Sequence, residues 1–256
     1  KLPISEKGLD DPSYIKFSKG SAEEKYLLES RKKLGGKLPV RKVNLEPQYF
    51  DEDKIFEEFN SESKREMSTT MVFVRLLTSM LRDKKIGEKI VPIVPDEART
   101  FGMDGLFRQF GIYSREGQKY VPEDADKVMW YRESEDGVML EEGITEAGAF
   151  SAWLALATSY ANNQLPMIPF YIYYSMFGFQ RIHDLAWAAG DARAKGFLLG
   201  ATSGRTTLNG EGLQHQDGHS HILAQTIPNC RSYDPCFDYE LATIIEEGIN
   251  DMYVEN

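Results

Sequence analysis

Residues 141–150, EEGITEAGAF, run directly into the small, apolar stretch SAWLALATSYA at 151–161. The apolar stretch predicts a buried helix, and the acidic turn before it predicts where that helix begins. Glu146 falls in or beside the first helical turn, where unpaired backbone N–H groups and the helix dipole favour a carboxylate. The local sequence therefore favours a structural role for Glu146, as an acid at the helix start. The alternative is that Glu146 takes part in chemistry.

Apolar strand patterns and helical patterns alternate on both sides of this stretch. Strands are predicted at 90–94, 167–173, 197–202 and 229–232, and helices at 61–83, 103–108, 219–225 and 238–252, with a further amphipathic helix within 176–194. This alternation predicts an α/β fold with a doubly wound, mostly parallel sheet of about six strands and helices on both faces. In such a sheet, ligand sites collect where the strands end.

The N-terminal part of the chain has a different character. Residues 1–55 predict a connecting arm with one short helix at 21–34, and residues 56–256 predict the globular α/β domain. Within the arm, Ser21 can cap the helix, Glu23 and Glu24 suit its first turn, and Gly35 and Gly36 end it.

Composition narrows the class of protein. The chain has 256 residues, 41% of them hydrophobic, and a formal net charge of −10, which argues against nucleic-acid and anionic-membrane partners. Two cysteines without metal-ligand spacing favour a reducing, cytoplasmic location, and neither a membrane-length apolar run nor a signal peptide is visible. The start at Lys1, without Met, suggests part of a longer polypeptide.

Two clusters follow predicted strands. Asp96 and Glu97 are adjacent carboxylates with Arg99 two residues on, a pattern that can hold or relay a proton in a cleft or simply form a solvated loop. The stretch YYSMFGFQR at 173–181 can present an aromatic face to a flat heterocycle, although ordinary core packing explains such aromatics equally well.

A histidine-rich stretch, HQDGHSH at 215–221, allows three interpretations. The side chains of His215, Asp217, His219 and His221 suggest a metal-binding module, although the spacing is not the helical HExxH pattern. Alternatively, a histidine donates a hydrogen bond to a substrate, or the stretch is a polar helix cap. The preceding Gly-rich loop, at 202–218, matches neither GxxxxGK[ST] nor GxGxxG, so it fails as a nucleotide motif.

Taken together, several stretches resemble the homodimeric bacterial pyruvate dehydrogenases, the thiamine-diphosphate-dependent first component of the pyruvate dehydrogenase complex. The motifs are DEARTFGMDGLFRQFGIYS (96–114), EEGITEAGA (141–149), PMIPFYIYYSMFGFQR (166–181), AWAAGDARAKGFLLGATSGRTTLNGEGLQHQDGHSH (186–221) and IPNCRSYDP (227–235). The resemblance runs from about residue 60 to the end of the chain. It implies the middle, pyrimidine-binding domain of a transketolase-like enzyme.

The resemblance also implies roles for single residues. Glu146 matches the glutamate that hydrogen-bonds the pyrimidine nitrogen N1′ and so activates the cofactor, and Phe177 matches the aromatic that stacks on the pyrimidine. Tyr174 and His215 match residues that contact pyruvate and its cofactor adduct, so Tyr174 counts with both the cofactor-binding and the catalytic groups.

Asp96 and Glu97 match acids between the two active sites of the dimer, which are proposed to communicate through protons. The family's diphosphate and Mg²⁺ motif is absent from the chain, so these ligands are expected in another domain. The implied partners are pyruvate, the lipoyl group of the acetyltransferase component and a second subunit. A related 2-oxo acid dehydrogenase or transketolase-like enzyme is the alternative, and the chain alone is expected to be inactive.

Overall fold

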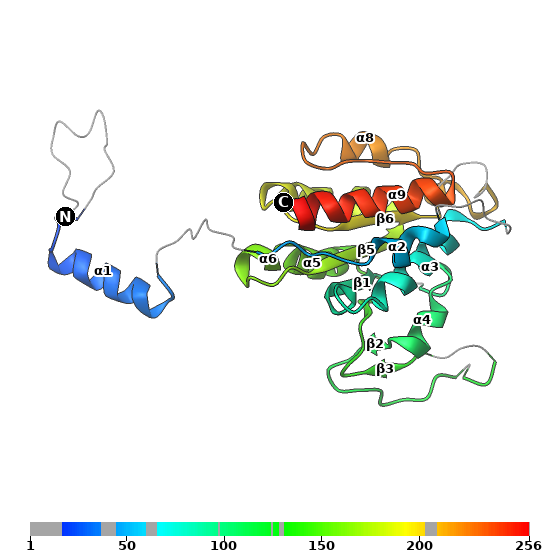
Figure 1. Cartoon of the computed structure of the whole chain (residues 1–256), viewed down its shortest axis with the longest axis horizontal. Coiled ribbons are helices and arrows are strands. Elements are labelled where there is room, and N and C mark those ends of the chain that lie inside the picture. Colours follow the sequence, from blue (N-terminus) through cyan, green and yellow to red (C-terminus); the bar gives the residue numbers. More distant parts are fainter. Residues whose placement is uncertain are drawn as a thin grey trace. The chain divides into compact units, whose positions relative to one another are not determined.

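The computed structural model describes residues 17–36, 45–59, 66–96, 98–123, 125–127, 131–202 and 209–255. The chain divides into two compact units, Lys1–Lys42 and Val43–Asn256 (Figure 1). In the larger unit, Phe50, Ile55 and Phe56 are already part of the core, with 7% or less of each residue exposed. The predicted boundary between a connecting arm, residues 1–55, and a globular domain, residues 56–256, stays a prediction.

The smaller unit contains helix α1, Ala22–Lys33, close to its predicted bounds. The Ser21 hydroxyl accepts a hydrogen bond from the Glu24 N–H at 3.1 Å, and the Glu24 carboxylate accepts one from the Gly20 N–H at 2.5 Å. Gly35 and Gly36 have φ of +91° and +110°, the left-handed conformation that ends a helix. The predicted cap and stop are therefore confirmed.

The main sheet has four strands in the order β4-β1-β5-β6, and all neighbouring pairs are parallel. Its strands are β1 (Ile90–Val94), β4 (Leu140–Glu141), β5 (Ile168–Tyr174) and β6 (Phe197–Ala201). Two further strands, β2 (Ile112–Tyr113) and β3 (Glu133–Ser134), pair with each other in the lobe drawn below the sheet in Figure 1. The prediction of about six strands in one sheet is approximate, because the described residues form one sheet of four strands and a separate sheet of two.

Each central strand is apolar on both faces, because both faces are covered. Along β5, Phe170 and Ile172 belong to one hydrophobic cluster, whereas Tyr171 and Tyr173 belong to a second cluster on the other face. Side chains alternate between faces of a strand, so this continuous apolar run builds two cores at once. On the first face, Phe170 stacks on Phe197 of β6 with the ring centroids 4.6 Å apart.

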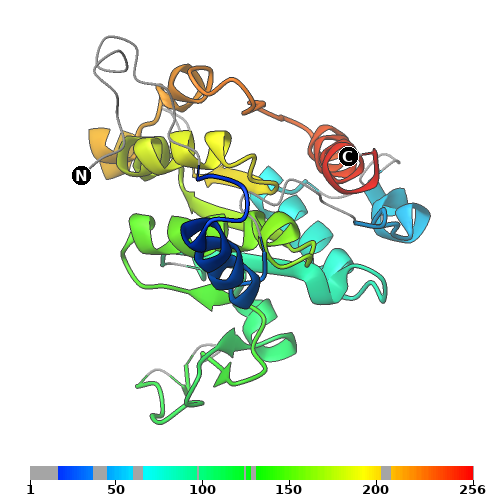
Figure 2. The ribbon, with the colours of Figure 1, turned by 90° about the vertical axis from the view of Figure 1, so that its left-hand side faces the viewer.

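Helices cover the two faces of the sheet separately (Figures 1 and 2). The first face packs against α2 (Glu52–Phe56), α3 (Thr69–Leu81) and α9 (Asp238–Ile249), and the second against α5 (Glu146–Ala157), α7 (Gly178–Asp191) and α8 (Ser220–Ala224). Two further short helices are α4 (Asp104–Gln109) and α6 (Ser159–Asn162). The predicted doubly wound α/β architecture is thus confirmed.

One predicted strand, at 229–232, is wrong. The Cys230 N–H donates to the Ile227 carbonyl at 3.1 Å, and the Asn229 side-chain amide donates to the Gly190 carbonyl at 2.9 Å. These contacts fold the segment into a turn beside α7. Its preceding residue, Pro228, also lacks the N–H that a strand would need for pairing.

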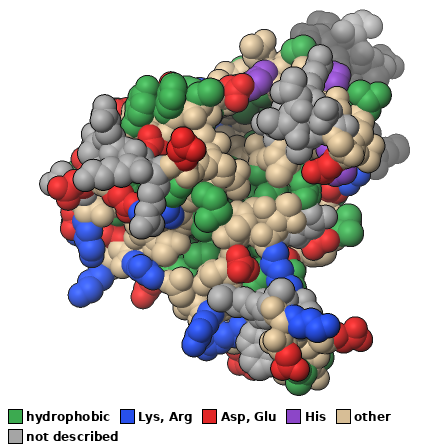
Figure 3. All heavy atoms as spheres, turned by 90° about the vertical axis from the view of Figure 1, so that its right-hand side faces the viewer, with side chains coloured by type: hydrophobic (Ala, Val, Ile, Leu, Met, Phe, Trp, Pro, Cys, Tyr) green, Lys and Arg blue, Asp and Glu red, His purple; other side chains and the backbone are tan. Residues whose placement is uncertain are grey.

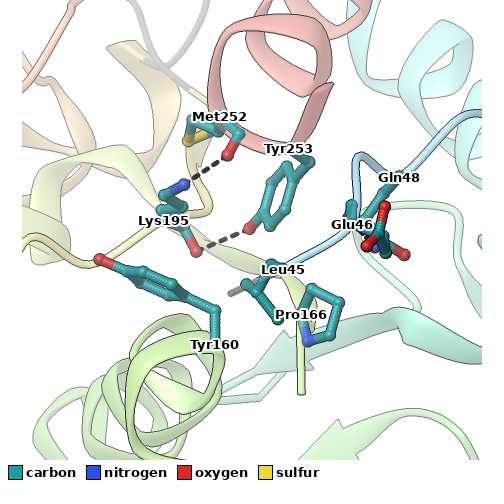
Figure 4. Close-up of a pocket in the computed structure, with 8 residues that line it drawn as sticks. All are labelled: Leu45, Glu46, Gln48, Tyr160, Pro166, Lys195, Met252 and Tyr253. Carbon is teal, nitrogen blue, oxygen red and sulfur yellow. Dashed lines mark hydrogen bonds between the residues drawn. The ribbon is translucent and has the colours of Figure 1, made fainter. Parts of the chain in front are cut away.

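At the amino ends of the strands, hydrogen bonds connect several segments of the chain around a small pocket (Figure 4). The Lys195 ammonium donates to the Met252 carbonyl at 2.7 Å, and the Tyr253 hydroxyl donates to the Lys195 carbonyl at 2.8 Å. The Gln48 N–H donates to the Tyr253 carbonyl at 2.8 Å, and the Lys195 ammonium lies 4.7 Å from the Tyr160 ring centroid. These contacts hold the segment before α2, which contains Gln48, and the segment Met252–Tyr253 next to Lys195, just before β6.

Candidate active site at the carboxyl edge of the sheet

The described site residues predicted from sequence all follow the carboxyl ends of the parallel strands. Asp96 follows β1, Glu146 follows β4, Tyr174 and Phe177 end or follow β5, and His215 lies in the loop after β6. From β1 the chain proceeds first to β4 on one side and later to β5 on the other, so the strand order reverses here. Such a reversal opens a crevice for ligands. Figure 3 faces this edge, and hydrophobic side chains are visible there between charged groups.

Glu146 is the first residue of α5, as predicted, and its helix is capped by the preceding threonine. The Thr145 hydroxyl accepts a hydrogen bond from the Gly148 N–H at 3.2 Å. The Glu146 side chain is 12% exposed, and its Oε1 accepts a hydrogen bond from Arg181 Nη1 at 2.5 Å. The helix start thus has a cap from Thr145, and the Glu146 carboxylate contacts Arg181 of α7.

Arg181 connects this carboxylate to an aromatic ring. Its guanidinium carbon lies 4.4 Å from the centroid of Phe177, one helical turn earlier in the chain. A flat, N–H-bearing group therefore lies against both the Glu146 oxygen and the Phe177 ring. Beneath the pair, the Tyr171 hydroxyl is buried without a hydrogen-bond partner among the described residues. Burial raises the pKa of Tyr171, and the Glu146 charge adds to this effect.

The rings of Phe177, Tyr174 and His215 lie together beside Arg181. The His215 ring lies edge-to-face with Phe177, at 5.3 Å between centroids, and with Tyr174, at 5.6 Å. Tyr174 also packs against Phe101 at 5.2 Å. The aromatic motif and the histidine-rich loop, which are far apart in sequence, therefore share one site.

The two ring nitrogens of His215 differ in their contacts. Its Nε2 lies 3.7 Å from the Glu211 carboxylate, whereas its Nδ1 is buried without a hydrogen-bond partner in the described part of the chain. A buried polar atom without a partner is costly, and a ligand is one way to satisfy it. This arrangement fits the interpretation of His215 as a substrate contact.

Asp217 holds the histidine loop against the end of β5. Its carboxylate accepts hydrogen bonds from the Ser175 hydroxyl and from the N–H groups of His219 and Ser220, the last two at 2.9 and 3.2 Å. Partial burial alone would raise the pKa of Asp217, but these hydrogen bonds and one from the Ser220 hydroxyl lower it to about 2. The carboxylate therefore stabilises the fold in its ionised form.

Replacing Asp217 by asparagine is expected to lower the free energy of unfolding of the chain by about 1 kcal/mol at pH 7, less than the full pKa shift implies, because solvent screens this partly exposed carboxylate. Because the folded pKa lies below the ordinary value, this stability is present above about pH 4 and is lost as the pH falls towards 2. Urea unfolding of both proteins between pH 2 and 7 measures the difference.

Asp251→Asn is the control for this measurement. Asp251 pairs with Arg231 at the surface, where the two side chains are 38% and 74% exposed, so the change is expected to cost less than about 0.5 kcal/mol. A difference between Asp217→Asn and the parent chain that stays constant from pH 7 to pH 2 would contradict the assignment.

At the ends of β1 and β4, the structure brings together two acids that the sequence did not pair. Asp96 follows β1, and Glu141 ends β4, where it is paired in register with Val94. Glu141 Oε1 is buried without a hydrogen-bond partner in the described ranges. Burial, and after it the Asp96 charge, raise the pKa of Glu141 to about 7, although a hydrogen bond from the Ala98 N–H and the Arg99 charge oppose the change. Glu97 lies outside the described residues.

Replacing Glu141 by glutamine is expected to stabilise the chain by about 1–3 kcal/mol above pH 7. The unfolded carboxyl releases its proton near pH 4.5 and the folded one near pH 7, so the folded state binds more protons in between. Stability therefore falls as the pH rises through this window, and the advantage of glutamine is absent below it.

The neighbouring exposed acid provides the control for this second pH series. Glu142→Gln changes the same charge one residue later at an exposed position, and it is expected to leave the pH dependence unchanged. If Glu141→Gln instead destabilises the chain at pH 8, the buried carboxylate has a stabilising partner and the prediction is wrong.

The metal-module alternative finds no support. Among the described residues, no group of three His, Cys, Asp or Glu side chains is placed to hold a metal ion. The Asp217 carboxylate is engaged by Ser175 and the backbone, and His221 Nδ1 contacts the Ser232 hydroxyl.

In the described part of the chain, no helix is both long and apolar enough to cross a membrane.

The residues present fit the pyrimidine end of thiamine diphosphate. The carboxylate of Glu146 and the ring of Phe177 already hold a flat N–H donor, the Arg181 guanidinium, as an aminopyrimidine would require. The unpartnered His215 Nδ1 supplies a further polar contact at the same place. Sequence patterns missed Glu141 and left Arg181 without a role, because only tertiary contacts reveal what each side chain faces.

The sequence of the chain is similar to sequences of known proteins. Residues 46–256 match the family model for the pyruvate dehydrogenase E1 component middle domain. The chain is 57%, 58% and 57% identical to the pyruvate dehydrogenase E1 components of Cupriavidus necator, Pseudomonas aeruginosa and Escherichia coli K12, over 258, 259 and 255 residues. Each alignment covers 99% of this chain, which spans 29% of the length of each relative.

The fold also has a relative among solved structures. Transketolase from Campylobacter jejuni aligns with a TM-score of 0.54 at 16% sequence identity, over 90% of this chain and 30% of the transketolase chain. At this level of identity, the likeness concerns the fold.

Proposed function

The chain belongs to the pyruvate dehydrogenase E1 component middle-domain family, and on that premise we propose that it is the pyrimidine-binding part of a thiamine-diphosphate-dependent pyruvate dehydrogenase. The parent enzyme decarboxylates pyruvate and transfers the acetyl unit to the lipoyl group of the acetyltransferase component. The ligands for Mg²⁺ and the diphosphate lie in a part of the enzyme outside this chain. Two subunits contribute to each cofactor site.

The observation that carries this proposal is the placement of one flat cation. The Arg181 guanidinium lies 2.5 Å from Glu146 Oε1 and 4.4 Å from the Phe177 ring centroid. A carboxylate acceptor beside an aromatic face suits a flat heterocycle that carries ring nitrogens. When bound, thiamine diphosphate supplies the carbon nucleophile that adds to the keto group of a 2-oxo acid.

Each side chain of the site then has its own task. Glu146 shares a proton with the pyrimidine nitrogen N1′, and Phe177 stacks on the ring. Tyr174, at the end of β5, and His215, in the loop after β6, contact the substrate, and Asp217 keeps that loop in place. Asp96 and Glu141 form an acid pair that can hold a proton beside the site. Glu97 is proposed to act with Asp96.

The proposal is tested with the full-length enzyme, thiamine diphosphate and Mg²⁺. Pyruvate is expected to be decarboxylated faster than 2-oxobutanoate, 2-oxoglutarate or branched 2-oxo acids, and acetylated lipoyl domain should appear when that domain is added. A preference for another 2-oxo acid, or transfer to a sugar acceptor, would assign the chain to a related enzyme of the same group.

The chain alone should show no turnover under the same conditions. It contributes the pyrimidine half of the site, and diphosphate binding requires residues from elsewhere. Robust pyruvate decarboxylation by the 256-residue chain would show that this division of the site is wrong.

A further inference from the structure

We propose that Tyr171 is a positioning residue whose hydroxyl donates a hydrogen bond to the Glu146 carboxylate when the pyrimidine end of the cofactor is bound. This inference rests on the proposed function, because it concerns how that carboxylate is held for the cofactor. It assigns a task to a buried polar group for which neither the sequence patterns nor the packing of the fold accounts.

The hydroxyl of Tyr171 contributes nothing to the packing of the chain. Tyr171 lies in the central strand β5 and is 0% exposed, and its hydroxyl oxygen has no hydrogen-bond partner among the described residues. A buried hydroxyl that is left unpaired costs free energy, whereas phenylalanine would fill nearly the same space without that cost. The stability of the chain alone therefore does not explain why this ring carries a hydroxyl.

Two other buried tyrosines show how a phenol supports the fold. The Tyr253 hydroxyl donates to the Lys195 carbonyl at 2.8 Å, and the Tyr160 hydroxyl donates to the Arg193 carbonyl at 2.8 Å. Both acceptors lie just before β6, at the opposite end of the sheet from the candidate site. The hydroxyl of Tyr171 differs from these two both in its location and in its lack of a partner.

The packing of Tyr171 places its ring beside the start of α5. The ring lies edge-to-face with Phe150, at 5.5 Å between centroids, and stacks on Tyr173 at 4.7 Å. Phe150 follows Glu146 by four residues, and residues four apart lie on the same face of a helix. The charges of Glu146 and Arg181 both act on the pKa of Tyr171, so the hydroxyl lies close to this ion pair.

Of these two charged neighbours, Glu146 is the one that can accept a hydrogen bond. Burial raises the pKa of Tyr171, so the phenol keeps its proton and remains a donor. A guanidinium has donors only, whereas a carboxylate has several acceptor positions, of which Arg181 uses one at Oε1. A hydrogen bond to an ionised acceptor is roughly twice as strong as one to a neutral acceptor. A second donor would therefore hold the Glu146 carboxylate in one orientation.

Binding of the cofactor strengthens this contact. The Glu146 side chain is 12% exposed, so water still reaches it, and a pyrimidine ring bound over it would remove that water. A carboxylate that loses water gains more from a donor that is already buried, because the surroundings have a lower dielectric constant. The unpaired hydroxyl thus lowers the stability of the chain alone and raises the affinity for the cofactor.

The experiment compares Tyr171→Phe with Tyr253→Phe in the full-length enzyme, because each substitution removes one buried phenol oxygen. Without thiamine diphosphate, Tyr171→Phe is expected to leave the midpoint of urea unfolding unchanged or to raise it, whereas Tyr253→Phe lowers it. Isothermal titration calorimetry with Mg²⁺ in excess then measures the binding of thiamine diphosphate. Tyr171→Phe is expected to weaken this binding about five-fold, and Tyr253→Phe is expected to leave it unchanged.

A double-mutant cycle identifies the acceptor. In a Glu146→Gln background, Tyr171→Phe should weaken binding less than about two-fold, because a neutral amide accepts a weaker hydrogen bond than a carboxylate. A five-fold loss that persists in this background but disappears in an Arg181→Gln background would assign the hydroxyl to the arginine and overturn the inference.

Two further results would overturn it. One is unchanged affinity of Tyr171→Phe for thiamine diphosphate, and the other is a lower urea midpoint of Tyr171→Phe without the cofactor, which would make the hydroxyl a structural group. If the unaltered enzyme does not bind thiamine diphosphate at all, the proposed function is wrong and the inference fails with it. If the unaltered enzyme binds the cofactor and only the Tyr171 results disagree, the proposed function stands and the inference alone is wrong.

Discussion

Replacing Glu146 by glutamine in the full-length enzyme is expected to slow exchange of the thiazolium proton of bound thiamine diphosphate by about 10²–10⁴-fold. Glutamine has nearly the same shape, and its carbonyl oxygen can still accept the hydrogen bond from Arg181. It cannot, however, hold or share a proton with the pyrimidine nitrogen. Proton exchange followed by NMR after rapid quenching measures the effect directly.

The fold should be nearly unaffected by the same substitution. The Thr145 hydroxyl already caps α5, and the glutamine carbonyl can keep the hydrogen bond from Arg181, so the main loss is the interaction of the Glu146 charge with the helix dipole and with that arginine. Losing that charge at a helix start costs about 0.3–1 kcal/mol. A loss of exchange far larger than the loss of stability would identify Glu146 as a catalytic group.

Glu240 is a matched control because it is also an acid in a first helical turn. Its carboxylate accepts hydrogen bonds from the N–H groups of Cys236 and Phe237, at 2.8 and 3.0 Å, and lies outside the site. Glu240→Gln is expected to cost similar stability and to leave proton exchange unchanged. If both variants slow exchange equally, Glu146 is only a structural acid.

Gly178→Ala is expected to destabilise the chain by about 3 kcal/mol or more. A Cβ atom at Gly178 would overlap the ring of Tyr173, whose Cζ would lie 2.7 Å away. Tyr173 is 4% exposed and stacks on Tyr171 at 4.7 Å between centroids, so its ring has no room to withdraw. The start of α7 would have to shift instead.

That shift would also reach the site. Gly178 lies between Phe177 and Arg181, so a displaced helix start moves both side chains away from Glu146. We therefore expect weaker thiamine diphosphate binding in the full-length enzyme as well as a lower midpoint of urea unfolding. The two measurements together distinguish a local shift from general unfolding.

Gly105→Ala provides the contrast for the second substitution. Gly105 lies in α4, and a Cβ atom there would meet nothing within 4 Å. Alanine in an open helical position is expected to be neutral or to stabilise by up to about 1 kcal/mol. If Gly178→Ala proves equally harmless, the close approach of α7 to Tyr173 has been misjudged.

Much of the fold could be predicted from sequence because it depends on local patterns. The apolar run at 168–174 is too short and too continuous for an amphipathic helix, and it became the central strand β5. The hydroxyls of Ser21 and Thr145 precede helices and cap them. The segment at 229–232 was mispredicted because its hydrogen bonds go to turns and to Gly190 instead of to a strand, and no local pattern announces that.

The candidate site divides in the same way. The sequence alone predicted which loops could form a site, because strands that end in acids, aromatic pairs or histidines must place them at one edge of a parallel sheet. Only the tertiary structure decided which of these groups meet: the Glu146–Arg181–Phe177 contact joins residues 35 and 4 positions apart, and the Glu141–Asp96 pair joins the ends of two strands. The physical reason is that helix starts and strand patterns are set by neighbours in the chain. Whether a charged side chain is stabilised or destabilised depends instead on the groups that the fold places beside it.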